Sequence, residues 1–196
     1  INFTNVNITE DKRAVYVDIS GNCNIKDSTF KNGVTDTDGA ALHVTGSGNL
    51  VVENSYFINN YAEYYIFYPR GDEIYYGSGG AVYLSLDSSS NVTFIDAVFK
   101  NNSAGIDGGA ICVASPLNRL LIIHSEFLNN TPYSNPKKDS LSPSGGGAIF
   151  ISSDIDDFEI KDSDFINNTA KMGGAIVYMG SEPLTIRDSE FLDNKI

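Results

Sequence analysis

The sequence predicts an all-β protein, a right-handed parallel β-helix (solenoid) of about six coils with three short strands each. Three observations support this fold class. A unit of about 27 residues recurs along the chain, its residues are mainly β-favouring types in short alternating runs, and its apolar positions align when the units are stacked. Helical repeats usually need a longer unit rich in Ala, Leu, Glu and Lys, and parallel connections of this kind are usually right-handed.

Two short motifs mark the repeat. "GGAV" at 79–82 returns as "GGAI" at 108–111, 146–149 and 173–176. "FINN" at 57–60 returns as FKNN at 99–102, FLNN at 127–130, FINN at 165–168 and FLDN at 191–194, and looser copies begin at Phe3 and Phe30. Stacked at the parallel-strand spacing, six units give a rod on the order of 29 Å long.

The core is expected from columns of equivalent positions. Two columns follow the motif alanine, at the first and third places, and two precede the phenylalanine. The phenylalanines should stack in one line inside the rod and the alanines in another. These two lines are Phe3, Phe30, Phe57, Phe99, Phe127, Phe165 and Phe191, and Ala14, Ala41, Ala81, Ala110, Ala148 and Ala175.

Glycine and asparagine are expected at the turns. The Gly-Gly pair suits a corner where a side chain would clash or where a positive φ is needed. Asparagine tolerates left-handed turns and forms hydrogen bonds along a stack. We therefore interpret one asparagine column as a structural ladder rather than a ligand set, namely Asn32, Asn59, Asn101, Asn129 and Asn167.

The pairing of GGA[IV] with FxxN over the whole chain resembles the repeats of chlamydial polymorphic outer membrane proteins and of adhesin-like surface proteins of methanogenic archaea. The resemblance implies a secreted or cell-surface β-helix used in adhesion, without naming a ligand. We expect an extracellular segment, 1–196, of a longer surface protein, with further repeats or caps at both ends because solenoid ends need covering.

Composition excludes some partners. The net charge is −12, so nucleic acid would be repelled along most of the surface. No apolar run approaches the length of a transmembrane helix, so we expect no membrane insertion in this segment. Cys23 and Cys112 lie in columns of opposite orientation three coils apart, so both are expected to be free thiols.

Two insertions interrupt the period at one corner, 61–78 and 131–145, with the Phe99 coil between them. Insertions on one edge of a solenoid are often its binding edge, and tyrosine offers rigid contact area with a polar tip. The alternative is that these aromatic residues only pack the loop onto the rod. The predicted binding residues are Tyr64, Tyr65, Tyr68, Arg70, Tyr75, Tyr76, Tyr133 and Lys137.

The sequence contains other candidate sites. The outward column Tyr16, His43, Tyr83, Cys112, Phe150 and Val177 forms either a flat apolar interface or ordinary β-surface. Glycosylation sequons begin at Asn2, Asn7, Asn91, Asn101, Asn129 and Asn167, three of them in the asparagine column. Asp36 with Asp38, or Asp154 with Asp156 and Asp157, could offer oxygen ligands to calcium, but a solvated acidic turn explains them as well.

The functional expectation is a non-catalytic recognition segment of an adhesin that binds a glycan or surface protein of another cell. We expect no cofactor and no catalytic residue. The carboxylates Asp27, Asp96, Asp162 and Asp188 recur once per coil, as a structural ladder does, and His43 and His124 lie on different strands. The alternatives are a polysaccharide-acting lyase or hydrolase, and a passive stalk.

Overall fold

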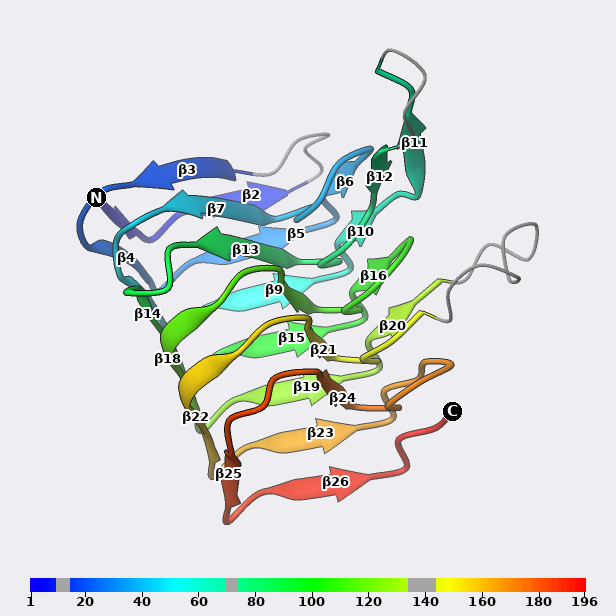
Figure 1. The fold of residues 1–196 in the computed structure, drawn as a ribbon. Coiled ribbons are helices and arrows are strands. Elements are labelled where there is room, and N and C mark those ends of the chain that lie inside the picture. Colours follow the sequence, from blue (N-terminus) through cyan, green and yellow to red (C-terminus); the bar gives the residue numbers. More distant parts are fainter. Residues whose placement is uncertain (10–14, 70–73, 134–143) are drawn as a thin grey trace.

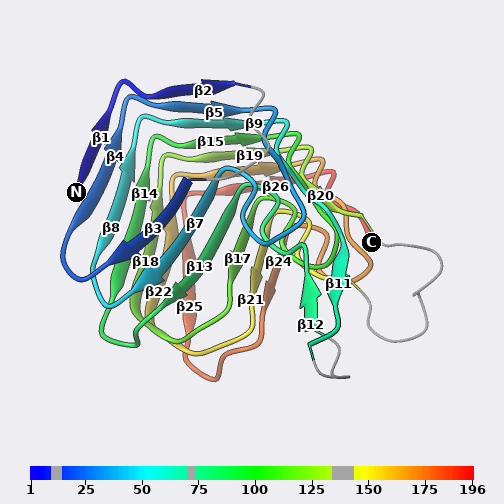
Figure 2. The ribbon, with the colours of Figure 1, turned by 90° about the horizontal axis from the view of Figure 1, so that it is seen from above.

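A computed structural model describes residues 1–9, 15–69, 74–133 and 144–196 of the chain. Within these residues every regular element is a β-strand, and the chain winds around one axis so that equivalent strands of successive coils lie side by side (Figure 1). Viewed along the stack, the strands superpose into the walls of an open prism (Figure 2). The predicted parallel β-helix is confirmed.

Three parallel sheets form the walls. The first contains β1 (Asn2–Thr4), β4 (Cys23–Lys26), β8 (Leu50–Glu53), β14 (Asn91–Ile95), β18 (Leu117–Ile123), β22 (Ile155–Lys161) and β25 (Leu184–Arg187). The second contains β2 (Asn7–Thr9), β5 (Thr29–Lys31), β9 (Tyr56–Ile58), β15 (Val98–Lys100), β19 (Glu126–Leu128), β23 (Asp164–Ile166) and β26 (Glu190–Leu192). The third contains β3 (Val15–Ile19), β7 (Leu42–Gly46), β13 (Val82–Leu86), β17 (Ile111–Val113), β21 (Ile149–Ile151) and β24 (Ile176–Tyr178).

A short fourth sheet, in addition to the three strands per coil predicted from the sequence, closes the corner between the second and third sheets. It contains the two-residue strands β6 (Val34–Thr35), β10 (Tyr61–Ala62), β16 (Ser103–Ala104) and β20 (Thr131–Pro132). β11 (Tyr65–Phe67) and β12 (Ile74–Tyr76) pair with each other in an antiparallel hairpin outside the coil.

The phenylalanine stack fills the interior behind the second sheet. From Phe57 to Phe165 each ring is fully buried, and successive ring centroids lie 4.5–4.8 Å apart with nearly parallel planes. The expected stack is thus confirmed from Phe30 to Phe191. Each ring contacts the next at the spacing of the strands, so the repeat period itself creates the stack.

The first coil has a different register from the one predicted. Phe3 pairs with Ile25 in the first sheet, and Ile8 occupies the phenylalanine position because it pairs with Phe30. Both registers keep an apolar residue inside, so alternation alone could not choose between them. Ala14 lies outside the described residues. The alanine ladder from Ala41 to Ala175 is confirmed, since each N–H donates to the alanine carbonyl of the next coil at 2.8–2.9 Å.

Glycine is required at the corner before the third sheet for two different reasons. The first glycine of the motif has a left-handed backbone, for example φ 65° at Gly108. The second is crowded, because a Cβ on Gly109 would lie 2.2 Å from the Gly147 carbonyl oxygen. No other residue satisfies both positions.

Two asparagine ladders run side by side along the stack. The exposed one was predicted: Asn32, Asn59, Asn101 and Asn129 have φ of 55–58°, and each side chain bonds the next at 3.2 Å. The buried one was missed, although its residues come one place later in the same motif. It contains Asn60, Asn102, Asn130, Asn168 and Asn194.

Each member of the buried ladder from Asn60 to Asn168 ties three coils together. The side-chain N–H₂ of Asn102 donates to the Phe57 carbonyl oxygen at 2.9 Å and to Asn130 Oδ1 at 3.0 Å. Its Oδ1 accepts from the backbone N–H and the side chain of Asn60 at 3.0 and 2.9 Å. A fully buried amide whose bonding groups are engaged in this way stabilises the corner instead of destabilising it.

Candidate recognition site

Both insertions leave the coil at the same corner, as predicted. The first two residues of each predicted range, Tyr61–Ala62 and Thr131–Pro132, belong to the coil as β10 and β20, so the insertions leave the coil after these strands. The order of the fourth sheet places β16 between them. The Phe99 coil, which includes β16, crosses this corner with a short turn at 105–107. The two longer segments therefore flank a shorter one.

The first insertion, predicted only as a loop, contains a β-hairpin of β11 and β12. Tyr65 lies opposite Tyr76, and Phe67 lies opposite Ile74. The hairpin projects from the corner, away from the walls of the coil, in both views (Figures 1 and 2). Because side chains alternate along a strand, these four residues share one face of the hairpin, and Ile66 and Tyr75 share the other.

The hairpin exposes much of its apolar surface. Tyr65, Phe67 and Ile74 are each 40–48% exposed, although a long apolar side chain usually finds cover in a folded domain. Tyr68, directly after β11, is 60% exposed and Tyr75 is 42% exposed. We call the exposed side chains of Tyr65, Phe67, Tyr68, Ile74 and Tyr75 the hairpin surface; it includes both faces of the hairpin, because Tyr75 lies on the face opposite that of Tyr65, Phe67 and Ile74.

The remaining predicted residues divide into three groups. Tyr64 and Tyr76 are half-buried, and the Tyr64 ring lies 6.4 Å from the Tyr75 ring, so Tyr64 supports the hairpin from its base. Tyr133 is 56% exposed where the second insertion begins. Arg70 and Lys137 lie outside the described residues.

Close backbone contacts fix where the hairpin joins the coil. A Cβ on Gly77 would meet the Glu63 carbonyl oxygen at 2.4 Å, and one on Gly105 would meet the Tyr64 backbone N at 2.3 Å. The two arms of the hairpin and the short turn of the next coil are thus in direct contact. Burial raises the pKa of Tyr61 in this corner, and the negative charge of Glu63 acts in the same direction.

The outward column of the third sheet is largely covered, in contrast to the flat open face considered above. Cys112 and Val177 are only 4% and 9% exposed. The turns before the strands lie over Phe150 and Val177: a Cβ on Gly173 would meet Val177 at 2.6 Å, and one on Gly145 would meet the Phe150 ring at 3.0 Å. Burial strongly raises the pKa of the Cys112 thiol. Only the Tyr16 end of the column is well exposed, at 64%.

Other predicted features have structural roles. Asp27, Asp96, Asp162 and Asp188 all have φ of 47–50°, which supports their interpretation as turn residues, and His124 occupies the same turn with φ 48°. Cys23 and Cys112 are free and buried, as expected. No cluster of three or more His, Cys, Asp or Glu side chains able to hold a metal occurs in the described part of the chain. Across the same residues, no helix has the length and apolar character to span a membrane.

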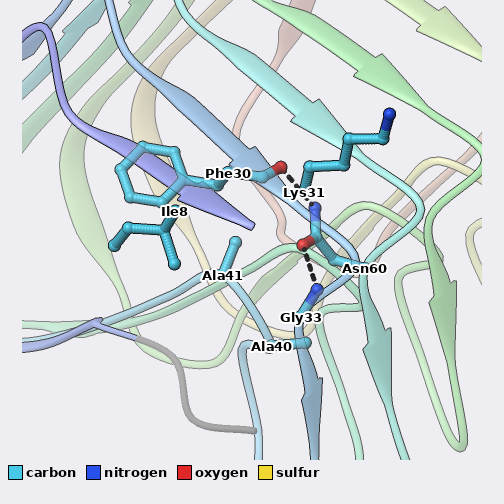
Figure 3. Close-up of a pocket in the computed structure, with 7 residues that line it drawn as sticks. All are labelled: Ile8, Phe30, Lys31, Gly33, Ala40, Ala41 and Asn60. Carbon is cyan, nitrogen blue, oxygen red and sulfur yellow. Dashed lines mark hydrogen bonds between the residues drawn. The ribbon is translucent and has the colours of Figure 1, made fainter. Parts of the chain in front are cut away.

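A small pocket lies at the N-terminal end of the stack, between Ile8, Phe30 and Ala41 (Figure 3). Asn60, the first residue of the buried ladder, borders it. Its side chain donates to the Phe30 carbonyl oxygen at 3.1 Å and accepts from the Gly33 N–H at 3.0 Å. The ladder engages these polar groups, so the pocket offers mainly apolar contacts.

These parallel sheets, stacked side chains and repeated turns define a solenoid of the β-helix class. The family model described as "Right handed beta helix region" matches residues 1–135, more than half of the chain. The chain belongs to this right-handed β-helix family. No significant match was found among the curated proteins or the solved structures.

Proposed function

We propose that this chain is a non-catalytic recognition segment of a cell-surface adhesin, and that it binds a protein or glycan of another cell through the hairpin surface. The observation that carries the proposal is the hairpin itself. It lies outside the coil, the repeat does not require it, and it exposes five large apolar or aromatic side chains.

The composition of the hairpin surface favours a protein as the partner. Tyrosine suits both sugars and proteins, because its ring offers apolar area and its hydroxyl a hydrogen bond. Ile74 offers neither a ring for stacking on a sugar nor a polar group, and it lies opposite Phe67. Apolar surface of this kind gains most free energy when another apolar surface covers it.

The extracellular location and the adhesin class rest on the resemblance of the GGA[IV] and FxxN repeats to those of surface proteins. Exposed apolar residues of the last coil, Ile186, Phe191 and Leu192, support the proposal that a further repeat or cap covers this end of the stack. The recurrence of the acidic side chains at one structural turn supports a non-catalytic role.

The proposal is tested by direct binding of the purified chain to a glycan array and to surface proteins captured from whole cells and then purified. The informative variant is Tyr65→Ser with Phe67→Ser, and we expect it to lose binding. Tyr16→Ser is the matched control, because Tyr16 is more exposed than either residue but lies on the third sheet. Equal binding by the hairpin variant, or measurable depolymerisation of a polysaccharide by the wild type, would contradict the proposal.

A further inference from the structure

Two buried or half-buried aspartates occupy equivalent positions, each directly before the first glycine of a corner. Asp38 precedes Gly39, and Asp107 precedes Gly108; both glycines have positive φ. The equivalent position is Ser78 in the coil between them and Gly145 in the coil after Asp107. The aspartates therefore alternate with residues that carry no charge.

Each carboxylate binds the backbone of the following coil at the residue where an insertion ends. Asp38 Oδ1 accepts from the N–H groups of Gly77 and Ser78 at 2.9 and 2.8 Å. Asp107 Oδ1 accepts from the N–H of Gly145 at 2.8 Å. These are the last residues of the insertions 61–78 and 131–145, before the chain re-enters the coil.

The carboxylates are additional to the ordinary bonds of the repeat. At the four described corners from Gly39 to Gly146 the first glycine N–H donates to a carbonyl of the next coil, with or without an insertion: Gly39 to Ser78 at 3.0 Å, Gly79 to Asp107 at 2.8 Å, Gly108 to Gly145 at 3.0 Å and Gly146 to Met172 at 2.9 Å. A side-chain acceptor is present at Asp38 and Asp107, each followed by a coil with an insertion. Ser78 and Gly145 are each followed by a coil with a short turn.

We propose that Asp38 and Asp107 are positioning residues, each of which fixes the C-terminal stem of the insertion on the next coil. Asp38 thereby sets the direction in which the hairpin leaves the corner. A bond to an ionised acceptor is stronger than a neutral one, and the low exposure of Asp38, 7%, protects it from competition by water. Only the consequence for recognition rests on the proposed function; the anchoring itself does not.

The test needs no ligand, since it measures amide hydrogen exchange of the stem residues by NMR. Asp38→Ser introduces the residue that the repeat itself carries at Ser78, so the coil is expected to tolerate it, but the shorter side chain cannot reach the stem. We expect exchange at Gly77 and Ser78 to become about tenfold faster or more, as loss of a bond to a charged acceptor predicts. Exchange at Gly145 should be unchanged. Asp107→Ser should show the reverse pattern.

Two controls separate positioning from general destabilisation. Asp38→Asn keeps an oxygen acceptor of the same reach and should restore slow exchange at Gly77 and Ser78. Asp36→Ser removes an exposed carboxylate two residues away and should leave amide exchange at Gly77, Ser78 and Gly145 unchanged.

The proposal is overturned if Asp38→Ser leaves the Gly77 and Ser78 amides protected, or accelerates Gly145 equally. It is also overturned if the Gly77 and Ser78 amides exchange as fast in Asp38→Asn as in Asp38→Ser. If one of the two serine variants does not fold, the exchange measurement on the other variant decides whether the proposal holds. If neither variant folds, the two carboxylates stabilise the coil rather than the stems, and the proposal fails.

Discussion

The buried asparagine ladder gives the sharpest prediction about stability, because the chain supplies its own control one residue away. Asn102→Ala removes four side-chain hydrogen bonds and leaves the Phe57 carbonyl oxygen and two Asn60 donors buried without those partners. At about 1 kcal/mol net for each bond, the free energy of unfolding should fall by about 4 kcal/mol. Orphaned buried groups would make the loss larger.

Asn101→Ala is the control. Asn101 belongs to the same motif, but its two ladder bonds are exposed and 3.2 Å long. The main loss there comes from placing alanine at φ 55°, about 1–2 kcal/mol. The assay is urea denaturation followed by circular dichroism and by tyrosine fluorescence, with both probes required to agree. If Asn102→Ala costs no more than Asn101→Ala, the buried ladder does not stabilise the coil and our reasoning is refuted.

Further expectations concern the core and a buried carboxylate. Phe99→Ala should lower the free energy of unfolding by about 3–5 kcal/mol, because the ring lies between Phe57 and Phe127 and the coil cannot close over the void; an unchanged urea midpoint would contradict this. Burial raises the pKa of Asp38, against the opposing effect of its bonds from Ser78 and Gly77, so protonation favours the folded state. The free energy of unfolding of the wild type, relative to that of Asp38→Asn, should therefore rise as the pH falls from neutral through the raised pKa towards 3.8, and it should stay level below pH 3.8. Denaturation curves of the two proteins at each pH measure this difference. A decrease over the same pH range would contradict the prediction.

The fold was predictable because the same motif positions recur in successive coils. Gly108 and Phe99 each have equivalents in several other coils, and stacking these equivalents aligns the core positions without any knowledge of long-range contacts. The predicted register was wrong for the first coil because that coil has no clear copy of either motif. Phe3 and Ile8 are both apolar and alternate equally well with their neighbours, so only the pairing with β4 and β5 decides between them.

The buried ladder corresponds to a pattern that is visible in the sequence. Asparagine occupies this column in five successive coils, at Asn60, Asn102, Asn130, Asn168 and Asn194, and Gly33 takes the position only in the coil before them. A run of asparagines next to a core column indicates buried amides that satisfy each other.

The candidate site was predictable in position but not in form. The broken period located both insertions at one corner, and "YIF" and "IYY" flank a turn-like segment, yet strand pairing between Tyr65 and Tyr76 depends on contacts that the repeat does not specify. The roles of Asp38 and Asp107 were hidden for the same reason. Each carboxylate is recognised by what it binds on the next coil, and residue type alone indicated only a possible calcium ligand at Asp38 and no role for Asp107.

The central claim, that the hairpin surface is the recognition site, is tested most directly by removing the hairpin while keeping the coil. Residues 63–77 are replaced by Gly105 and Ile106 of the next coil, and Ser78 is kept so that no new carboxylate precedes Gly79. Ala62 is kept because it is fully buried and pairs with Ala104. Asp38→Ser is included so that no buried carboxylate is left without its donors. Melting temperature and binding to the partner protein or cells are then measured on the same preparation. We predict an unchanged melting temperature with binding abolished, whereas a stable variant that still binds at full strength would contradict the account.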